Sequence, residues 1–285
     1  MNKWITKEIC TLLAECGDIA LKHYEKRSWK FKSDRSLITA ADSEIENLLK
    51  QEFDRPDESA YLIGEETVGT KSEKYIASAM KETSWIVDPI DGTAPYAHHV
   101  PTWGISIGFM RGGVLREGAV FLPATCELFI TEGEKVLYAR TEIKNGKTRI
   151  LPLKKLCSKK MALTDGGLIS VSQDVAKRGH LALPNPVQAV CCTVFSGAYL
   201  TMGRYLAYIG CVRLWDIGGI LPVLFKSGFK GRLISGQELT LKIDEKIYHL
   251  GKGHPERWRM RNQMILAPDS RTIRYIAGKL KDPGK

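Results

Sequence analysis

The chain has 285 residues, of which 44% are hydrophobic and 26% charged, and its formal net charge is +10. This balance is typical of a globular protein and excludes a disordered or collagen-like chain. No run of 18 or more apolar residues occurs, so the sequence predicts no membrane-spanning helix and no membrane partner. The amphipathic N-terminal segment does not resemble a signal peptide, and we expect a cytoplasmic protein.

Seven cysteines are scattered along the chain without a Cys-x-x-Cys pair. Their odd number and spacing argue against a zinc site and favour reduced, buried thiols. We therefore interpret the adjacent pair Cys191-Cys192 as packing rather than as a nucleophile.

The positive charge is concentrated in residues 140–160, where eight Lys and Arg side chains are opposed only by Glu142. A second basic group lies within residues 252–261. A solvated basic face is the favoured interpretation, because no aromatic-interleaved or zinc-finger pattern accompanies either group. Contact with nucleic acid remains the alternative.

In chain order, the helical spacing of apolar residues predicts helices over residues 3–26, 41–53 and 72–81. The second of these begins at Thr39 or Ala40, which places Asp42 in its first turn. Strand-like runs then predict strands over residues 85–88, 104–110, 114–121, 127–131 and 136–139.

Asn145-Gly146 is a turn signal within the basic segment, and we place a domain boundary there, between residues 1–145 and 146–285. The second part is predicted to contain strands over 168–171 and 232–234 and helices over 193–208, 217–226 and 270–280. Strands that lead into helices with acids at the junctions are typical of a layered α/β protein with its site at the strand ends.

The most informative motif is Asp88-Pro89-Ile90-Asp91-Gly92-Thr93, which follows the strand-like residues 85–87. Its two carboxylates are close together and repel each other unless a cation lies between them. Mg²⁺ is the hard cation that binds such oxygens together with a substrate phosphate. Gly92 allows the backbone to approach a ligand closely, and N–H groups of such a turn bind phosphate. Taken alone, the motif could also be an acidic surface turn.

Two further motifs place acids at similar positions. Gly64-Glu65-Glu66 follows the apolar residues 61–63, so its acids are expected at the end of a strand. Asp216 precedes an apolar helix and is expected in a first turn, with its carboxylate directed out of the helix N-terminus.

Residues 37–42, 64–66, 85–93 and 215–216 are similar, in this order, to the signature motifs of the inositol monophosphatase family of Mg²⁺-dependent, lithium-sensitive phosphatases. The resemblance spans residues 5–275. It implies an α/β (α+β) fold, the five-layer α-β-α-β-α sandwich of the inositol monophosphatase and fructose-1,6-bisphosphatase type. It also implies a phosphoric monoester hydrolase that acts on a small phosphorylated substrate, and a homodimer.

The resemblance assigns metal ligands for two or three Mg²⁺ ions per site. Asp88 is expected to bridge two ions, with Glu65 and the carbonyl oxygen of Ile90 on the first. Asp91 and Asp216 complete the second, and Glu65 also contacts a weaker third site through water.

The same resemblance assigns the proton transfer to Thr93 paired with Asp42, and assigns phosphate binding to Gly92, Thr93 and Asp91. From the residues alone, Thr93 could instead be a helix cap. Glu66 is either an outer-sphere residue or solvated, and the sequence does not decide between the two.

The chain departs from the family at two informative places. Ala94-Pro95-Tyr96 replaces the usual residue followed by Asn-Phe, and because Pro95 lacks an N–H donor it leaves the third phosphate contact open. Inositol-specific members also place a glutamate six or seven residues before the aspartate that Asp216 matches, where this chain has Ile209 or Gly210.

These departures predict a broad or non-inositol preference among sugar monophosphates, histidinol phosphate and similar esters. A 3′,5′-bisphosphate nucleotidase is one alternative, and a non-catalytic RNA- or protein-binding member of the fold is another.

Two histidines and an apolar segment that follow the motif need an interpretation of their own. His98 and His99 are adjacent, and adjacent imidazoles rarely bind one ion, so we expect structural or substrate-rim roles. The apolar residues 100–109, including Trp103, could form the dimer contact or equally well pack in the core.

Overall fold

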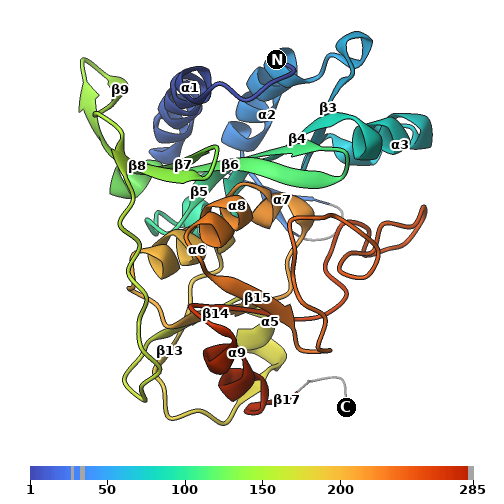
Figure 1. The fold of residues 1–285 in the computed structure, drawn as a ribbon. Coiled ribbons are helices and arrows are strands. Elements are labelled where there is room, and N and C mark those ends of the chain that lie inside the picture. Colours follow the sequence, from blue (N-terminus) through green and yellow to red (C-terminus); the bar gives the residue numbers. More distant parts are fainter. Residues whose placement is uncertain (27–28, 33–35, 282–285) are drawn as a thin grey trace.

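Helices and sheets alternate in five layers through the molecule (Figure 1). The structure is a computed structural model that describes residues 1–26, 29–32 and 36–281. The first helical layer contains α1 (Thr6–Tyr24) and α2 (Ala40–Phe53). The middle helical layer contains α6 (Thr193–Thr201), α7 (Leu214–Gly218) and α8 (Ile220–Lys226). The last helical layer contains α5 (Gln173–Arg178) and α9 (Ser270–Ala277). The predicted five-layer α-β-α-β-α sandwich is confirmed.

The larger sheet has eight strands in the order β10-β8-β7-β6-β5-β4-β3, with β9 paired to the end of β8. β3 and β4 are parallel, and β4 to β8 form antiparallel pairs. The strands are β3 (Ala60–Gly64), β4 (Thr83–Asp91), β5 (Gly104–Arg111), β6 (Val114–Leu122), β7 (Glu127–Glu132), β8 (Lys135–Lys144), β9 (Lys147–Ile150) and β10 (Lys154–Lys155).

The side chains of β4 alternate between two hydrophobic cores, as the period of a strand requires. Trp85 and Val87 belong to the core under α1 and α2, where the Trp85 ring stacks on Phe53 with centroids 4.0 Å apart. Ile86 points to the opposite face and packs beside Gly218 of α7. β4 is therefore buried on both faces and provides a rigid base for the acids at its end.

The smaller sheet has five strands in the order β13-β11-β14-β16-β15. Its strands are β11 (Ile169–Val171), β13 (Val187–Ala189), β14 (Ala207–Gly210), β15 (Lys230–Leu233) and β16 (Met264–Ala267). α5 and α9 cover its outer face through a third core that includes Val175, Ile273 and Ile276. The remaining short elements are β1 (Lys30–Phe31), β2 (Leu37–Ile38), α3 (Glu73–Lys81), α4 (Thr93–Ala97), β12 (His180–Leu181), β17 (Leu280–Lys281), and the 3₁₀ turns Pro56–Glu58, Val68–Thr70 and Pro123–Thr125.

The predicted helix over residues 193–208 is wrong in its second half. α6 ends at Thr201, Gly203 adopts a left-handed φ of +70°, and Ala207–Gly210 forms the central strand β14. A buried helix and a buried strand both appear as continuous apolar sequence, so periodicity could not separate them. The final helix is also shorter than expected, because α9 ends at Ala277 rather than at residue 280.

Asn145-Gly146 forms the turn of a hairpin between β8 and β9, and both residues have positive φ. The larger sheet continues beyond this hairpin to β10, so the chain passes to the smaller sheet after Lys155. The division into residues 1–145 and 146–285 stays a prediction.

Trp103 and residues 104–110 are buried within this chain and pack in the core, whereas Val100 at the start of the segment is 46% exposed. The dimer contact stays a prediction. Within the described ranges, no helix is long and apolar enough to cross a membrane.

Candidate active site

The acids predicted from the sequence converge at the carboxyl ends of β3 and β4. These strands are parallel, with Gly64 beside Val87, so the residues that follow them emerge at the same edge of the sheet. The backbone N–H of Glu65 donates to the carbonyl of Val87 at 3.3 Å, which places Glu65 directly beside Asp88.

A β-bulge brings Asp88 and Asp91 to the same side of the sheet. Asp88 pairs with Ser106 and Asp91 with Gly104, so β4 contains one more residue than β5 over this stretch. In a regular strand, residues three apart point to opposite faces. The extra residue reverses this alternation, because Ile90 packs on the α1–α2 side while Asp91 reaches α6 on the other side.

Asp91 links the end of β4 to the start of α6. Its Oδ2 accepts a hydrogen bond from the Val194 N–H at 2.6 Å, and the Cys192 thiol lies 3.3 Å from the same oxygen. Gly92 follows with φ +85°, and a Cβ there would lie 2.9 Å from the Cys192 Cβ and 3.0 Å from the Thr102 carbonyl oxygen. Only glycine fits this position on both conformational and steric grounds.

Asp216 is the third residue of α7, as the sequence predicted for a first-turn acid. Its Oδ2 accepts the backbone N–H of Arg213 at 2.8 Å, which closes a capping box. α7 approaches the larger sheet very closely, because the Gly218 carbonyl would lie 2.5 Å from a Cβ on Gly108. Ser106 also donates to the carbonyl of Trp215 at 3.1 Å and so ties β5 to the same helix.

Asp42 is the third residue of α2 and forms a second capping box. Its Oδ2 accepts the N–H and the hydroxyl of Thr39, at 2.8 and 2.6 Å, while its buried Oδ1 has no hydrogen-bond partner among the described residues. The Thr93 hydroxyl donates instead to the carbonyl of Ile90 at 3.1 Å. The expected Thr93–Asp42 hydrogen bond is therefore not formed in this conformation, and Asp42 Oδ1 is left to accept it.

Pro95 is the third residue of the short helix α4. The first N–H groups of a helix have no partner within the helix, so proline here breaks no helical hydrogen bond. What it removes is one free donor near the phosphate-binding turn.

Two charged residues at the site were not predicted from the sequence. Lys32 on the β1–β2 hairpin donates to Glu65 at 2.8 Å and to Glu66 at 2.7 Å. Glu46 on α2 is almost fully buried, and it accepts the Glu66 N–H at 2.8 Å. Glu46 lies one turn after Asp42, and this spacing along the buried face of α2 was the signal available in the sequence.

The carboxylates repel one another strongly. Burial raises the pKa of Asp88, and the charges of Glu65, Asp91 and Asp216 raise it further. Burial and the charges of Asp91 and Glu65 also raise the pKa of Asp216. Burial raises the pKa of Asp91 to about 7, against the opposing hydrogen bond from Val194.

The neighbouring acids follow the same pattern. Burial raises the pKa of Asp42 to about 6, although its hydrogen bonds with Thr39 act in the opposite direction. Burial and the charge of Glu65 raise the pKa of Glu66 to about 7, and Lys32 reduces this effect. Burial alone would lower the pKa of Lys32, but its two glutamates raise it overall. Glu66 is thus a partly buried partner of Lys32 rather than a solvated residue.

The residues present suit Mg²⁺ in charge and in donor type. Buried oxygen ligands that repel each other, with Lys32 as the neighbouring cation of Glu65 and Glu66, are stabilised when a hard divalent cation binds between them. In the part of the chain that the structure describes, no three acidic, His or Cys side chains already stand at metal-ligand spacing. Asp91, Asp216 and Glu65 each use one carboxylate oxygen to accept from an N–H or ammonium donor, which leaves the second oxygen of each carboxylate as a ligand for an ion.

The other predicted residues lie around this cluster. His98 stacks with Trp29, and His99 stacks with Tyr24 at 4.9 Å, in agreement with rim and structural roles. Cys192 caps α6, and burial raises its thiol pKa, which supports packing over nucleophilic chemistry. Ile209 is fully buried in β14, and a Cβ on Gly210 would lie 2.7 Å from the Tyr208 hydroxyl.

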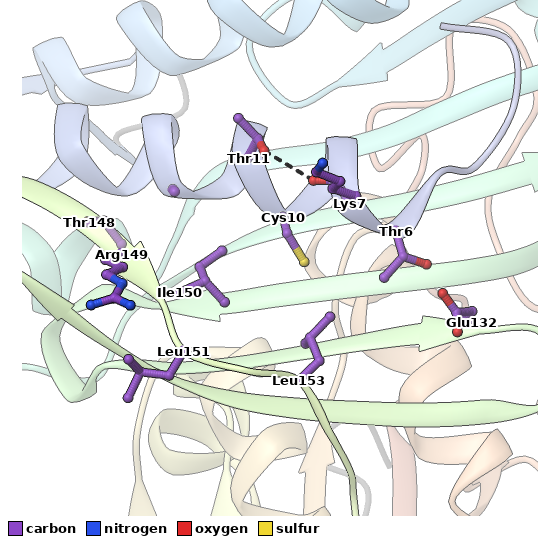
Figure 2. A pocket seen from close by; sticks show the side chains of 11 residues that line it. Thr6, Lys7, Cys10, Thr11, Glu132, Thr148, Arg149, Ile150, Leu151 and Leu153 are labelled. Carbon is purple, nitrogen blue, oxygen red and sulfur yellow. Dashed lines mark hydrogen bonds between the residues drawn. The ribbon is translucent and has the colours of Figure 1, made fainter.

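Two cavities must be distinguished. One of about 520 Å³ includes Glu65, Gly92 and Thr93 in its lining and therefore reaches one of the acids and the turn that follows β4. Another of about 610 Å³ lies between α1 and residues 148–153, with Cys10 and Arg149 in its lining (Figure 2), and contains none of the predicted site residues. The first is the candidate active site.

The chain is similar to several known proteins. Residues 1–259 match the sequence profile described as the Inositol monophosphatase family. A fructose-1,6-bisphosphatase/inositol-1-monophosphatase of Thermotoga maritima is 23% identical over 260 residues, 89% of this chain and 94% of that protein. A histidinol-phosphatase of Chlorobaculum parvum is 31% identical over 123 residues, 42% of this chain and 45% of that protein.

The fold is also found among solved structures. An inositol monophosphatase/NADP phosphatase complexed with Mg²⁺ and phosphate superimposes with a TM-score of 0.66 at 19% identity, covering 95% of this chain and 93% of that chain. At this identity the likeness shows the fold alone.

Proposed function

We propose, because the chain belongs to the inositol monophosphatase family, that it hydrolyses small phosphate monoesters with the help of two or three Mg²⁺ ions. Members of this family are phosphatases that hydrolyse phosphate monoesters, and the chain is a phosphatase of this family. The observation that carries the proposal is the convergence of Glu65, Asp88, Asp91 and Asp216 from three separate segments into one mutually repelling cluster, in which Asp88 and Asp91 are buried.

When bound, the ions would neutralise the phosphate charge and align the attacking and leaving oxygens. Asp88, placed between the other acids, is assigned to two ions. Glu65 and the Ile90 carbonyl are assigned to one of these, and Asp91 and Asp216 to the other. A structure of the same fold that contains Mg²⁺ and phosphate supports the choice of Mg²⁺. The assignment of individual ligands rests on the resemblance of the sequence motifs.

The remaining residues bind the phosphate and move the proton. The N–H groups of Gly92 and Thr93, at the start of α4, are assigned to the phosphate oxygens. The Thr93 hydroxyl takes the proton of the attacking water and passes its own to Asp42 Oδ1, the buried oxygen without a partner among the described residues. For this step Thr93 must release the carbonyl of Ile90.

We infer that the substrate is not strictly inositol 1-phosphate. Ile209 and Gly210 offer no side-chain acceptor for a ring hydroxyl, and losing one such hydrogen bond costs about 1–3 kcal/mol. A partial match to a histidinol-phosphatase supports a wider range of esters. The alternative substrate class is a 3′,5′-bisphosphorylated nucleotide, which the positive charge of residues 140–160 would favour.

The test is release of phosphate from p-nitrophenyl phosphate by the purified protein, with EDTA and then with added Mg²⁺. We expect no release in EDTA and full release with Mg²⁺. A folded protein that releases no phosphate from this ester or from a panel of metabolite phosphates would refute the proposal. Light scattering tests the homodimer, which a monomer-sized species would contradict.

A further inference from the structure

A small hollow on the outer side of the smaller sheet collects positive charge. It has a volume of about 80 Å³ and lies between β15 and α9, which contact each other (Figure 1). Lys230 and Arg232 of β15 and Arg274 of α9 contribute three cations to its lining, and Glu238 contributes the one carboxylate among the described residues. None of the acids of the candidate active site lines it, so the hollow is separate from that site.

The local geometry of β15 and α9 directs these side chains to the same place. Lys230 and Arg232 are two residues apart on a strand, so they project from the same face of the sheet. Ser270 and Arg274 are four residues apart on α9 and lie on one side of that helix. Ile273 of the same helix is buried in the third core and keeps α9 against the sheet. The fold itself therefore brings the three cations together.

The three cations have no acidic partner at close range. Within the described ranges, no carboxylate oxygen lies within 4.0 Å of the side-chain nitrogens of Lys230, Arg232 or Arg274. By contrast, Arg257 in the basic group of residues 252–261 is paired with Glu73 at 2.7 Å. Like charges that share one hollow repel each other, and an anion bound between them would replace this repulsion with attraction.

The donors in the hollow suit a tetrahedral oxyanion. The planar guanidinium groups of Arg232 and Arg274 can each bind two oxygens of one phosphate or sulfate, and Lys230 adds a point charge. The Arg232 Nε–H donates to the carbonyl of Gly236 at 2.9 Å, which orients this guanidinium without neutralising it. The Ser270 hydroxyl in the lining is a further donor.

The volume of the hollow limits the size of the ligand. The value of about 80 Å³ is far below the range of roughly 300–1,000 Å³ for sites that enclose a whole metabolite. It exceeds the share of about 30 Å³ that one water molecule occupies in the liquid. The hollow therefore suits a single free oxyanion, or the phosphoryl group of an ester whose remainder stays in solvent.

We propose that the hollow between β15 and α9 binds a phosphate-type oxyanion through Lys230, Arg232, Arg274 and the Ser270 hydroxyl. The inference does not depend on the proposed phosphatase function, because it uses none of the residues assigned to that function. The same anion would contact both elements, so its binding would fasten the edge strand β15 to α9 and stabilise the folded chain.

The experiment measures the binding of inorganic phosphate to the whole chain in EDTA, by calorimetry and by the melting temperature. EDTA is used because the repelling acids of the metal-free active site disfavour a further anion there. NaCl at the same ionic strength is the reference. Wild-type protein should bind phosphate and melt at a higher temperature.

Arg274→Ala is the main variant, and it should weaken phosphate binding by about 10- to 150-fold, the cost of losing hydrogen bonds to a charged group. Arg274→Lys keeps the charge without the planar fork and should recover part of the affinity. Glu238→Gln should have the opposite effect and tighten binding, since it removes a negative charge from the lining.

Lys135→Ala is the matched control, because it removes one exposed positive charge from β8 of the larger sheet. It should leave the affinity for phosphate within about twofold, since salt screens distant charges. Melting temperatures in NaCl alone show whether each variant is folded.

The choice of ligand separates the two sources of the anion. Binding of ribose 5-phosphate as tight as that of phosphate would assign the site to the phosphoryl group of an ester, and binding of phosphate and sulfate alone would assign it to the free ion. Both results support the proposal. Wild-type protein that binds no phosphate would overturn it, as would equal affinities in wild type, Arg274→Ala and Glu238→Gln. An equal loss in Lys135→Ala would also overturn it, because the effect would then be one of net charge.

Discussion

The carboxylate of Asp91 accepts a hydrogen bond of 2.6 Å from the backbone N–H of Val194, a residue 103 positions later in the chain. This contact fixes the end of β4 against the first turn of α6. It therefore joins the larger sheet, which contributes Asp88, to the helical layer that contributes Asp216. The site depends on how closely these two layers approach each other.

Asp88→Asn should reduce kcat/KM by more than about 100-fold, the upper end of what outer-sphere changes at metal sites cost. The protein should remain folded, and its melting temperature in EDTA should rise by about 2–4 °C for each kcal/mol of repulsion removed. Asp57→Asn, on an exposed 3₁₀ turn, is the control. Near-normal Mg²⁺-dependent activity in Asp88→Asn would contradict the metal assignment.

The stability of the metal-free protein should increase as the pH falls from 8 to about 5. The pKa values of Asp42, Glu66 and Asp91 are raised to about 6, 7 and 7, so the folded state binds protons more tightly than the unfolded state. The free energy of unfolding rises as the pH falls through these pKa values. The increase is complete near pH 4, the usual pKa of Asp and Glu side chains in an unfolded chain.

Melting temperatures measured in EDTA between pH 8 and 5 test this predicted rise in the stability of the metal-free protein. Mg²⁺ should flatten the dependence, because binding an ion displaces the same protons. Metal-free stability that falls between pH 8 and 6 would show that the acids are not the dominant titrating groups.

Gly108→Ala should weaken Mg²⁺ binding and activity although it lies outside the site. A Cβ at Gly108 would come within 2.5 Å of the Gly218 carbonyl, so α7 must move away from β5 and take Asp216 with it. We expect a loss of about 1–3 kcal/mol in unfolding free energy and a higher Mg²⁺ concentration at half-maximal activity. Gly69→Ala, where a Cβ meets no atom within 4 Å, should have neither effect.

Glu46→Ala should destabilise the turn that carries Glu65. Its carboxylate accepts the Glu66 N–H, and removing it leaves a partly buried donor without a partner, at a cost of about 1–3 kcal/mol. Denaturant unfolding and Mg²⁺ titration of activity should both show the loss. Glu44→Ala, an exposed glutamate of the same helix, serves as the comparison. An unchanged Mg²⁺ dependence in Glu46→Ala would reduce Glu46 to a purely structural residue.

Li⁺ and high Mg²⁺ should both inhibit turnover. This expectation follows from the resemblance of the sequence motifs to those of lithium-sensitive phosphatases, which implies a weaker metal site whose ion must leave with the product. Steady-state rates measured across a Li⁺ titration and across a Mg²⁺ titration test the two inhibitions. Full activity in tens of millimolar Li⁺ would separate this chain from the lithium-sensitive members.

Most of the acids could be located from the sequence because their positions follow from local rules. Glu65 directly follows β3, and Asp88 lies near the end of the neighbouring β4. Asp42 and Asp216 each occupy the third position of a helix, where a capping box forms. The bulge that brings Asp91 beside Asp88 was not predicted, since it depends on pairing with β5.

The residues that the sequence did not indicate are those whose role depends on distant partners. Lys32 reaches Glu65 and Glu66 only because the hairpin β1–β2 folds over the ends of β3 and β4. Trp29 and Phe31 had no periodic pattern to distinguish them from ordinary core residues. Their exposure within the cavity became visible only in three dimensions.

The assembly of one acidic cluster from the end of β3, from β4 and from α7 also has a consequence for the synthesis of the protein. Domains begin to fold from the N-terminus while the ribosome is still extending the chain. A nascent chain that ends before α7 contains Asp88 and Asp91 but lacks Asp216, and one that ends before α6 also lacks the N–H donor of Val194. Phosphatase activity should therefore appear only when most of the chain has been translated, so activity in a cell-free translation reaction would report completed chains rather than fragments.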